Sequence, residues 1–296
     1  MKTSNPIKLI ISCLALFISV FTYGQDFQGK AFYFSKTTVD MDNFGGREMS
    51  PDMKARIAER MKSMFEKTYV LTFNREESIY KEEEVLEAPG RGGGFGGMMS
   101  SFTGGPQYKN VKEGQLLQEN EFFGKQFLIK DELPKLEWKM GTETKQIGQY
   151  TCFKATAMKT VDEFDFRSMR RRNNDNETNE KEKDSTASND PMDQIEVPKE
   201  IEITAWYTPQ IPVNQGPGEY WGLPGLILEV NADRTTILCS KIVINPEEKS
   251  EIKMPTKGTE VTRKEYNDTI KKKMEEMRSM FRGRGRDGGG FRRGGN

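Results

Sequence analysis

The residue types that most often carry enzyme chemistry are sparse or absent in this sequence. It contains no histidine among its 296 residues, which excludes Ser-His-Asp and Cys-His catalysis, histidine-ligated zinc or haem, and imidazole acid–base chemistry. It contains no Cys-x-x-Cys pair, so a thiol-redox enzyme is not expected. Asp and Glu total 45, but abundance alone does not indicate a catalytic carboxylate pair. We therefore expect a protein that is not an enzyme and needs no cofactor.

Methionine is the one chemically distinctive residue that is frequent, with 16 copies. Clustered thioethers can bind cuprous copper. Three groups of this sequence could supply such a site, and they are Met53/Met61/Met64, Met98/Met99 and Met274/Met277/Met280. The alternative is that methionines at helical spacing fill gaps in a hydrophobic core. We favour core packing, predict no metal site, and keep soft-metal binding as an alternative function.

Residues 1–24 have the pattern of a secretory signal peptide. Lys2 and Lys8 flank the start of an apolar run of 13 residues, 9–21, which is too short to span a bilayer comfortably. Small residues at Thr22 and Gly24 predict cleavage before Gln25. We expect an exported protein that is periplasmic, associated with the outer membrane or secreted, and no later segment is apolar enough to span a membrane. The alternative is an uncleaved membrane anchor.

Two cysteines, Cys152 and Cys239, remain after removal of this leader, and each lies in a run typical of a β-strand. In an oxidising compartment the pair could form one disulfide. Closing so long a loop would stabilise the fold by about 4 kcal/mol in the chain-entropy description. The alternative is two buried free thiols, and the sequence leaves both open.

Charge is balanced over the chain but not at its C-terminal end. The formal net charge is zero, so long-range attraction of nucleic acid is not expected. Residues 282–296 contain five Arg, one Asp and seven Gly. This composition is typical of a disordered solubilising tail, or of contact with an anionic surface polymer or lipid headgroups. The run Arg170–Arg172 is interpreted as a solvated loop.

Apolar–polar alternation and turn residues predict a mainly β fold. About nine or ten strands are expected from eleven strand-like runs, which are 29–38, 69–73, 78–86, 116–117, 121–123, 126–129, 136–140, 146–158, 195–207, 226–230 and 235–244. Ser50 and Pro51 predict the start of one helix, and Thr262 with Glu265 forms a capping box for another. The pattern favours an α+β protein built on a curved antiparallel sheet or half-open barrel, with an N-terminal-half helix and a C-terminal helix packed peripherally.

The chain is expected to form a single domain over residues 25–258. Two polar or Gly-rich segments, 88–106 and 164–194, are expected to be flexible insertions. An amphipathic helix over 259–282 and a disordered Arg/Gly tail over 283–296 follow.

The densest apolar stretch of the mature chain is 220–230, which opens with Tyr220 and Trp221. Its Gly and Pro residues alternate permissive and rigid backbone, and this mixture specifies one path for the chain. The stretch contains no catalytic group. Just before it, alternation over 201–207 places Trp206 on the opposite face of a strand from Tyr207.

Residues Gly222, Leu223, Pro224, Gly225, Leu226 and Ile227 spell the signature of the GLPGLI family, which this chain therefore resembles. The resemblance extends to the strand at 147–155, to the lead-in at 205–208 and to 211–217. It is strong over 116–246 and weak over 28–86, and the two insertions and the Arg/Gly tail depart from the compact family pattern. The resemblance implies an exported Bacteroidetes protein of unknown function, often encoded near outer-membrane transport genes. It implies no catalytic residues.

Together these features predict a non-enzymatic envelope protein that binds a partner or an apolar ligand, and the family resemblance implies a role as an accessory to outer-membrane transport. The candidate binding residues are aromatic anchors on or beside the 206–228 loop, namely Trp206, Tyr207, Tyr220 and Trp221. Their expected place is the concave side of the sheet. The alternative is that they only pack the loop onto the sheet. A large apolar cavity would favour a lipid or lipoprotein carrier, whereas a filled core with an exposed aromatic patch would favour a protein partner.

Overall fold

The structure is a computed structural model, in which residues 27–38, 50–83, 104–161, 170–171, 195–196 and 199–284 are described. The predicted signal peptide lies outside the described residues. So do most of the predicted insertions, Met98 and Met99, and residues 285–296 of the tail.

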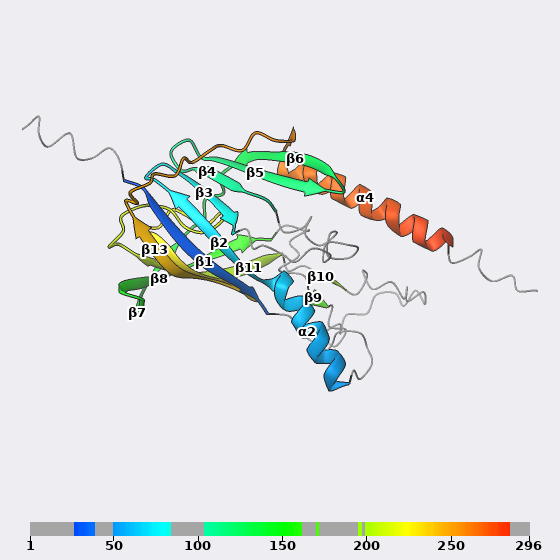
Figure 1. Ribbon diagram of the computed structural model, residues 1–296, viewed down its shortest axis with the longest axis horizontal. Coiled ribbons are helices and arrows are strands. Elements are labelled where there is room, and N and C mark those ends of the chain that lie inside the picture. Colours follow the sequence, from blue (N-terminus) through cyan, green and yellow to red (C-terminus); the bar gives the residue numbers. More distant parts are fainter. Residues whose placement is uncertain are drawn as a thin grey trace, which may run out of the picture.

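Most of the described chain forms one open sheet of 12 strands (Figure 1). Its strands are β1 (Gly29–Thr37), β2 (Glu66–Phe73), β3 (Glu77–Glu82), β4 (Gln107–Asn110), β5 (Gln115–Phe122), β6 (Lys125–Glu132), β7 (Lys139–Ile147), β8 (Tyr150–Thr160), β11 (Glu200–Thr208), β12 (Leu226–Ala232), β13 (Thr235–Ile244) and β14 (Thr259–Val261). A separate pair joins β9 (Arg170–Arg171) to β10 (Ile195–Glu196). The predicted β-rich class is confirmed, with more strands than expected.

Two antiparallel meanders make up the sheet. The first runs β1 to β6 in chain order and the second runs β7, β8, β11, β12, β13. They are joined where β1 pairs with β13, from Gly29 opposite Ile244 to Thr37 opposite Thr235. Strand β14 adds in parallel to β6. Within the described residues the edges β14 and β7 are not paired with each other, so the sheet is a curved, half-open structure rather than a closed barrel.

Several elements differ from the prediction, and three differences stand out. Strand β4 was missed, because it follows the Gly-rich tract and contains a single strongly apolar residue, Tyr108. Residues 141–143 separate the predicted strands 136–140 and 146–158 but lie within β7, where the register shifts between Met140 and Thr144. The tight turn falls instead at Gly148, whose φ of 59° favours glycine. Residues 259–261 were expected to be helical and form β14.

The sheet has two unlike faces. On β1, Ala31, Tyr33, Ser35 and Thr37 are buried, whereas Phe34 on the opposite face is 40% exposed. We call the face with Tyr33, Leu71 and Ile203 the inner face, and the face with Phe34 and Leu238 the outer face. The main hydrophobic core lies on the inner face.

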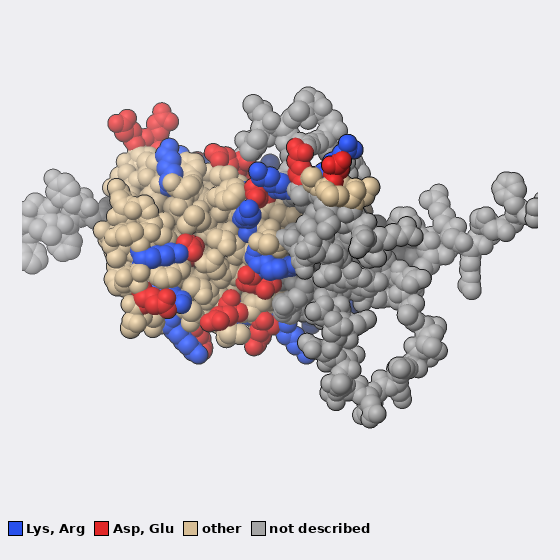
Figure 2. Space-filling model, turned by 90° about the horizontal axis from the view of Figure 1, so that it is seen from below, with Lys and Arg blue, Asp and Glu red and all other residues tan. Residues whose placement is uncertain are grey.

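Two helices lie at the periphery, as predicted. Helix α2 (Pro51–Phe65) begins at Ser50, whose hydroxyl accepts a hydrogen bond from the Met53 amide, and it contacts β1 and β2. Helix α4 (Arg263–Arg284) contacts β6 and β14 and extends past the end of the sheet (Figure 1). Acidic and basic side chains are interspersed over the described part of one face of the molecule (Figure 2).

Candidate functional site

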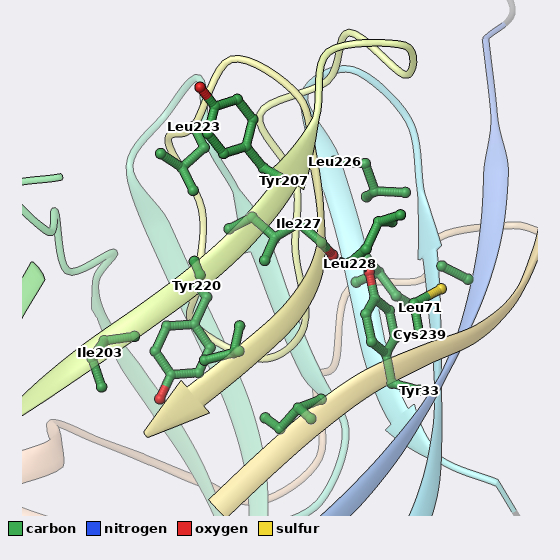
Figure 3. Close-up of a cluster of buried hydrophobic side chains, with 14 of the residues drawn as sticks. Tyr33, Leu71, Ile203, Tyr207, Tyr220, Leu223, Leu226, Ile227, Leu228 and Cys239 are labelled. Carbon is green, nitrogen blue, oxygen red and sulfur yellow. Dashed lines mark hydrogen bonds between the residues drawn. The ribbon is translucent and has the colours of Figure 1, made fainter. Parts of the chain in front are cut away.

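The loop between β11 and β12, residues 209–225, fills the inner face of the sheet. Its side chains Ile211, Val213 and Leu223 are at most 4% exposed and belong to the same core cluster as the strand residues. Figure 3 shows Leu223 and Tyr220 among the side chains of the neighbouring strands. The inner face is therefore closed by the protein's own chain, and its curvature does not leave an open concave surface here.

The signature motif has a physical reason at each buried position. Leu223, Leu226 and Ile227 are fully buried. Gly222 has a φ of 90°, a conformation that side chains other than glycine rarely adopt. A Cβ on Gly225 would meet the backbone carbonyl of Thr208 and would lie 2.8 Å from the Pro209 nitrogen. The motif thus encodes the close approach of two backbone segments and the anchoring of the loop in the core.

Backbone hydrogen bonds then join the loop to its surroundings. The Leu226 and Ile227 amides donate to the carbonyls of Ile211 and Gln215, each at 3.0 Å. The Tyr33 hydroxyl on β1 donates to the Ile227 carbonyl at 2.7 Å. Burial raises the pKa of Tyr33 well above its usual value, so the hydroxyl stays a donor.

A buried lysine, Lys109 on β4, organises the first half of the loop. Its ammonium nitrogen donates to the carbonyls of Gly216 at 2.7 Å, Gly218 at 2.8 Å and Tyr220 at 3.0 Å. Three carbonyls match the three protons of an ammonium group. Burial lowers the pKa of Lys109 to about 7, and the charge of Glu219 acts in the opposite direction. Sequence reasoning missed this residue because it missed the strand that carries it.

The four aromatic residues predicted to bind do not form one surface. Tyr207 and Tyr220 are buried in the main core, at 8% and 7% exposed. Trp221 is half-buried, and its indole donates to the Pro134 carbonyl at 2.7 Å. Trp138 in turn donates to the Trp221 carbonyl at 2.8 Å. These three predicted residues pack the loop onto the sheet, which is the alternative that the sequence left open.

Trp206 is different, because it points to the opposite side of β11 from Tyr207, and it is half-buried with part of its side chain packed against the main core cluster. The ammonium nitrogen of Lys145 lies 4.4 Å from the Trp206 ring centroid and forms an ion pair with Glu229 at 2.6 Å. Cation–π contact and ion pair together hold the indole against the sheet.

Trp206 belongs to a row of side chains that crosses six strands in direct register. We call this the outer row, and its members are Thr68, Phe34, Leu238, Glu229, Trp206 and Lys154. Phe34 and Leu238 are neighbours in the row and are 40% and 39% exposed. Alternation within each strand could have identified these positions, but the pairing of β1 with β13 that brings them together could not be derived from local sequence.

The two cysteines are both buried and belong to the same core cluster. They are free thiols in this structure, donating to the Tyr150 and Lys241 carbonyls. Burial raises the pKa of Cys152 to about 11 and that of Cys239 to about 12, and the charge of Cys152 contributes to the rise at Cys239 in the same direction. The disulfide stays a prediction.

The methionine side chains that the structure describes are half-buried in a core or exposed, and the groups suggested by the sequence are not seen as a cluster among them. Met274 is half-buried against Phe122, Phe127, Ile129 and Tyr266. Met53, Met140, Met158 and Met254 are exposed. Over the described residues, no group of three or more His, Cys, Asp or Glu side chains could bind a metal ion.

Comparison with known proteins gives limited information. Residues 138–229 match a family described as "Protein of unknown function (Porph_ging)", and this range ends four residues after Gly225. No curated protein matches the chain. Neither helix of the described part is long and apolar enough to cross a membrane.

Two solved structures are similar to the chain, titled "Structure of PNGF-II in C2 space group" and "Structure of PNGF-II in P21 space group". Each is 14% identical, with a TM-score of 0.45. The similarity covers 83% of this chain and 33% of the other, so this chain spans about one third of that protein's length.

Proposed function

We propose that this chain is an exported, non-enzymatic binding protein of the cell envelope, and that its outer row contacts a protein partner. The observation that carries the proposal is that two exposed apolar side chains, Phe34 on β1 and Leu238 on β13, lie opposite each other in the sheet. Trp206 lies in the same row, two strands from Leu238. Aromatic and large apolar residues are enriched where proteins meet, and charged residues lie at the rim of such surfaces.

The composition of the outer row supports a protein partner. Its centre is apolar at Phe34 and Leu238, and its far end carries Glu229 and Lys154. Helix α2 contacts β1 and β2, the strands that carry Phe34 and Thr68, whereas α4 contacts β6 and β14, which contribute nothing to the row. An apolar centre with a charged margin is the usual organisation of a modest protein interface.

The filled inner face of the sheet favours a protein partner, rather than an apolar ligand, as what this chain binds. The 209–225 loop occupies the place where a lipid would have to lie, and Leu223 is fully buried there. Admission of a lipid would require the loop to leave, with loss of the three hydrogen bonds from Lys109. A lipid carrier of this fold would not be expected to close its own cavity in this way.

Family and location are part of the same proposal. The identity of residues 222–227 with the GLPGLI signature, together with the match over 138–229, supports membership of an envelope family of unknown function. The signal-like residues 1–24 support export. A role as an accessory to outer-membrane transport rests on the family resemblance alone.

Site-specific photocrosslinking in the native envelope tests the proposal. A benzoylphenylalanine replaces Phe34 in one variant and Phe123, which is 48% exposed at the β5–β6 turn, in the control. We expect a discrete crosslinked protein from position 34 that is absent from position 123 and is lost when Leu238 is changed to Ser. Equal crosslinking at both positions, or none at position 34, would contradict the proposal.

A further inference from the structure

The two edges of the large sheet differ in how they are covered. At one edge, β14 is only three residues long, and helix α4 contacts both β14 and the neighbouring strand β6. At the other edge, β7 is nine residues long, and among the described residues no further strand pairs with its outer side. Long uncovered edge strands are the places where a sheet can add a strand from another chain.

The turn that follows β7 determines which backbone groups face its free side. Ile147 pairs with Tyr150 across a two-residue turn, and the pair that flanks such a turn is hydrogen-bonded. Hydrogen-bonded and non-hydrogen-bonded pairs alternate along an antiparallel ladder, so Gln146 and Thr144 direct their amides and carbonyls away from β8. The side chains of both residues are exposed. This part of β7 therefore offers a hydrogen-bonding edge to an additional strand.

Charged side chains on β7 restrict which strand can pair there. Glu143 forms an ion pair with Lys154 at 2.7 Å, and Lys145 forms one with Glu229 at 2.6 Å. Both contacts are with members of the outer row, so Glu143 and Lys145 lie on the same face of β7. Like charges directly opposite each other destabilise a strand pair. The partner strand therefore has to bring a basic residue opposite Glu143 and an acidic residue opposite Lys145.

A second copy of β7 meets this requirement. In a two-fold symmetric antiparallel pair centred on Thr144, Glu143 lies opposite Lys145 of the partner subunit, and this favourable pair occurs twice. Centring the pair on Glu143 or on Lys145 would place each of these charges opposite its own copy. Centring it on Thr142 would place Lys139 opposite Lys145. Charge therefore selects among the neighbouring registers.

The backbone distinguishes the one remaining register with opposite charges. Centring the pair on Gly141 joins only residues 139–143, most of which lie where β7 is out of register with β8. Centring it on Thr144 joins residues 141–147. It also places on the two-fold axis a residue whose amide and carbonyl face the free edge, so that the two copies of this residue exchange two hydrogen bonds.

We propose that two copies of this chain associate through the free edges of their β7 strands, with a two-fold axis at Thr144 normal to the sheet. The two sheets then form one continuous sheet, and the ion pairs of Glu143 and Lys145 join across the axis. An ammonium group has three protons, so Lys145 can bind both Glu229 and the partner's Glu143. This axis keeps the outer faces of both copies on the same side. The association does not depend on whether the outer row binds another protein.

Sedimentation velocity of the chain from residue 25 onward, over about 1 to 100 μM, tests the association. We expect a dimer whose fraction rises with concentration. Glu143→Lys should weaken dimerisation about tenfold or more, because it turns two opposite-charge pairs into like-charge pairs. The matched control Glu202→Lys, at an exposed position of β11, changes the net charge equally and should leave the dimer unchanged. A monomer over the whole range, or equal weakening by both variants, contradicts the proposal.

Disulfide trapping tests the register. Thr144→Cys and Thr142→Cys change two exposed threonines of the same strand, while the native thiols Cys152 and Cys239 are buried. In the proposed register the two thiols at position 144 face each other within the reach of a disulfide. Those at position 142 lie about 14 Å apart along the strand, at about 3.4 Å per residue.

Oxidation should therefore give a covalent dimer from Thr144→Cys that is absent from Thr142→Cys. Trapping at position 142 alone, or equal trapping at both positions, overturns the register centred on Thr144. Thermal unfolding of each variant under reducing conditions, expected to match wild type, shows that the chain is folded.

Discussion

The inner and outer faces of the sheet differ in what covers them, and neighbouring residues of β11 show this most directly. Tyr207 is 8% exposed within the main core, whereas Trp206 points to the opposite side of the strand, where it is only half-buried and lies under Lys145. The inner face is covered by the chain's own loop, with a buried ammonium group bonded to three carbonyls. The difference teaches that the signature motif serves the stability of the fold, and that the proposed recognition uses a surface away from it.

The largest expected effect comes from removing a side chain of the loop on the inner face. Leu223→Ala should lower the free energy of unfolding by about 2 to 5 kcal/mol, because Leu223 is fully buried and truncation leaves a cavity. The matched variant Leu238→Ala lies on the outer face, 39% exposed, and should cost less than about 1 kcal/mol. Urea unfolding measures both, and equal losses would show that the two faces do not differ as described.

A smaller effect, with a pH signature, is expected at Lys109. Lys109→Met leaves the carbonyls of Gly216, Gly218 and Tyr220 without their donor, at a cost of about 1 to 3 kcal/mol. The pKa of Lys109 is lowered to about 7 in the folded protein, whereas a lysine in the unfolded chain titrates near about 10.4. Between these values the unfolded chain binds more protons, so the free energy of unfolding should rise with pH.

The check is urea unfolding between about pH 6.5 and pH 7.5, about one unit or more below the pKa of about 8.5 at which cysteines of the unfolded chain titrate. Wild type should become more stable over this window, and Lys109→Met should lack that increase. A parallel rise in both proteins would show that another group titrates, and that Lys109 keeps its proton throughout.

Local sequence was sufficient for much of the fold and for little of the candidate site. Alternation predicted the strands around Tyr33 and Ile203, and the residues around Ser50 and Thr262 predicted both helix starts. It also placed Trp206 and Tyr207 on opposite faces. Grouping the two in one binding site neglected that separation, because proximity in sequence was taken as proximity in space.

What could not be predicted depends on contacts between distant segments. Lys109 meets a loop more than 100 residues away, and Phe34 meets Leu238 only because two meanders pair through β1 and β13. A lysine in a short strand after a Gly-rich tract carries no local sign of burial. Such contacts are set by topology, which a single sequence specifies through the whole core rather than through any one motif.

The smallest expected effect is at the ion pairs of the outer face, where two similar pairs differ in exposure. Lys145 pairs with Glu229 at 2.6 Å, and the Glu229 side chain is 13% exposed. Lys154 pairs with Glu143 at 2.7 Å, and the Glu143 side chain is 63% exposed. Water screens the second pair more strongly, so Lys154→Gln should change the free energy of unfolding by less than about 0.5 kcal/mol.

Lys145→Gln should cost more, about 1 kcal/mol, since it also removes the cation from the Trp206 ring. Part of this loss should persist at high salt, where exposed pairs are screened. A double-mutant cycle with Trp206→Leu isolates the ring contact. If the cycle gives no coupling, the lysine does not hold the indole against the sheet, and Trp206 is free to turn toward a partner in the way that Phe34 and Leu238 are proposed to meet one.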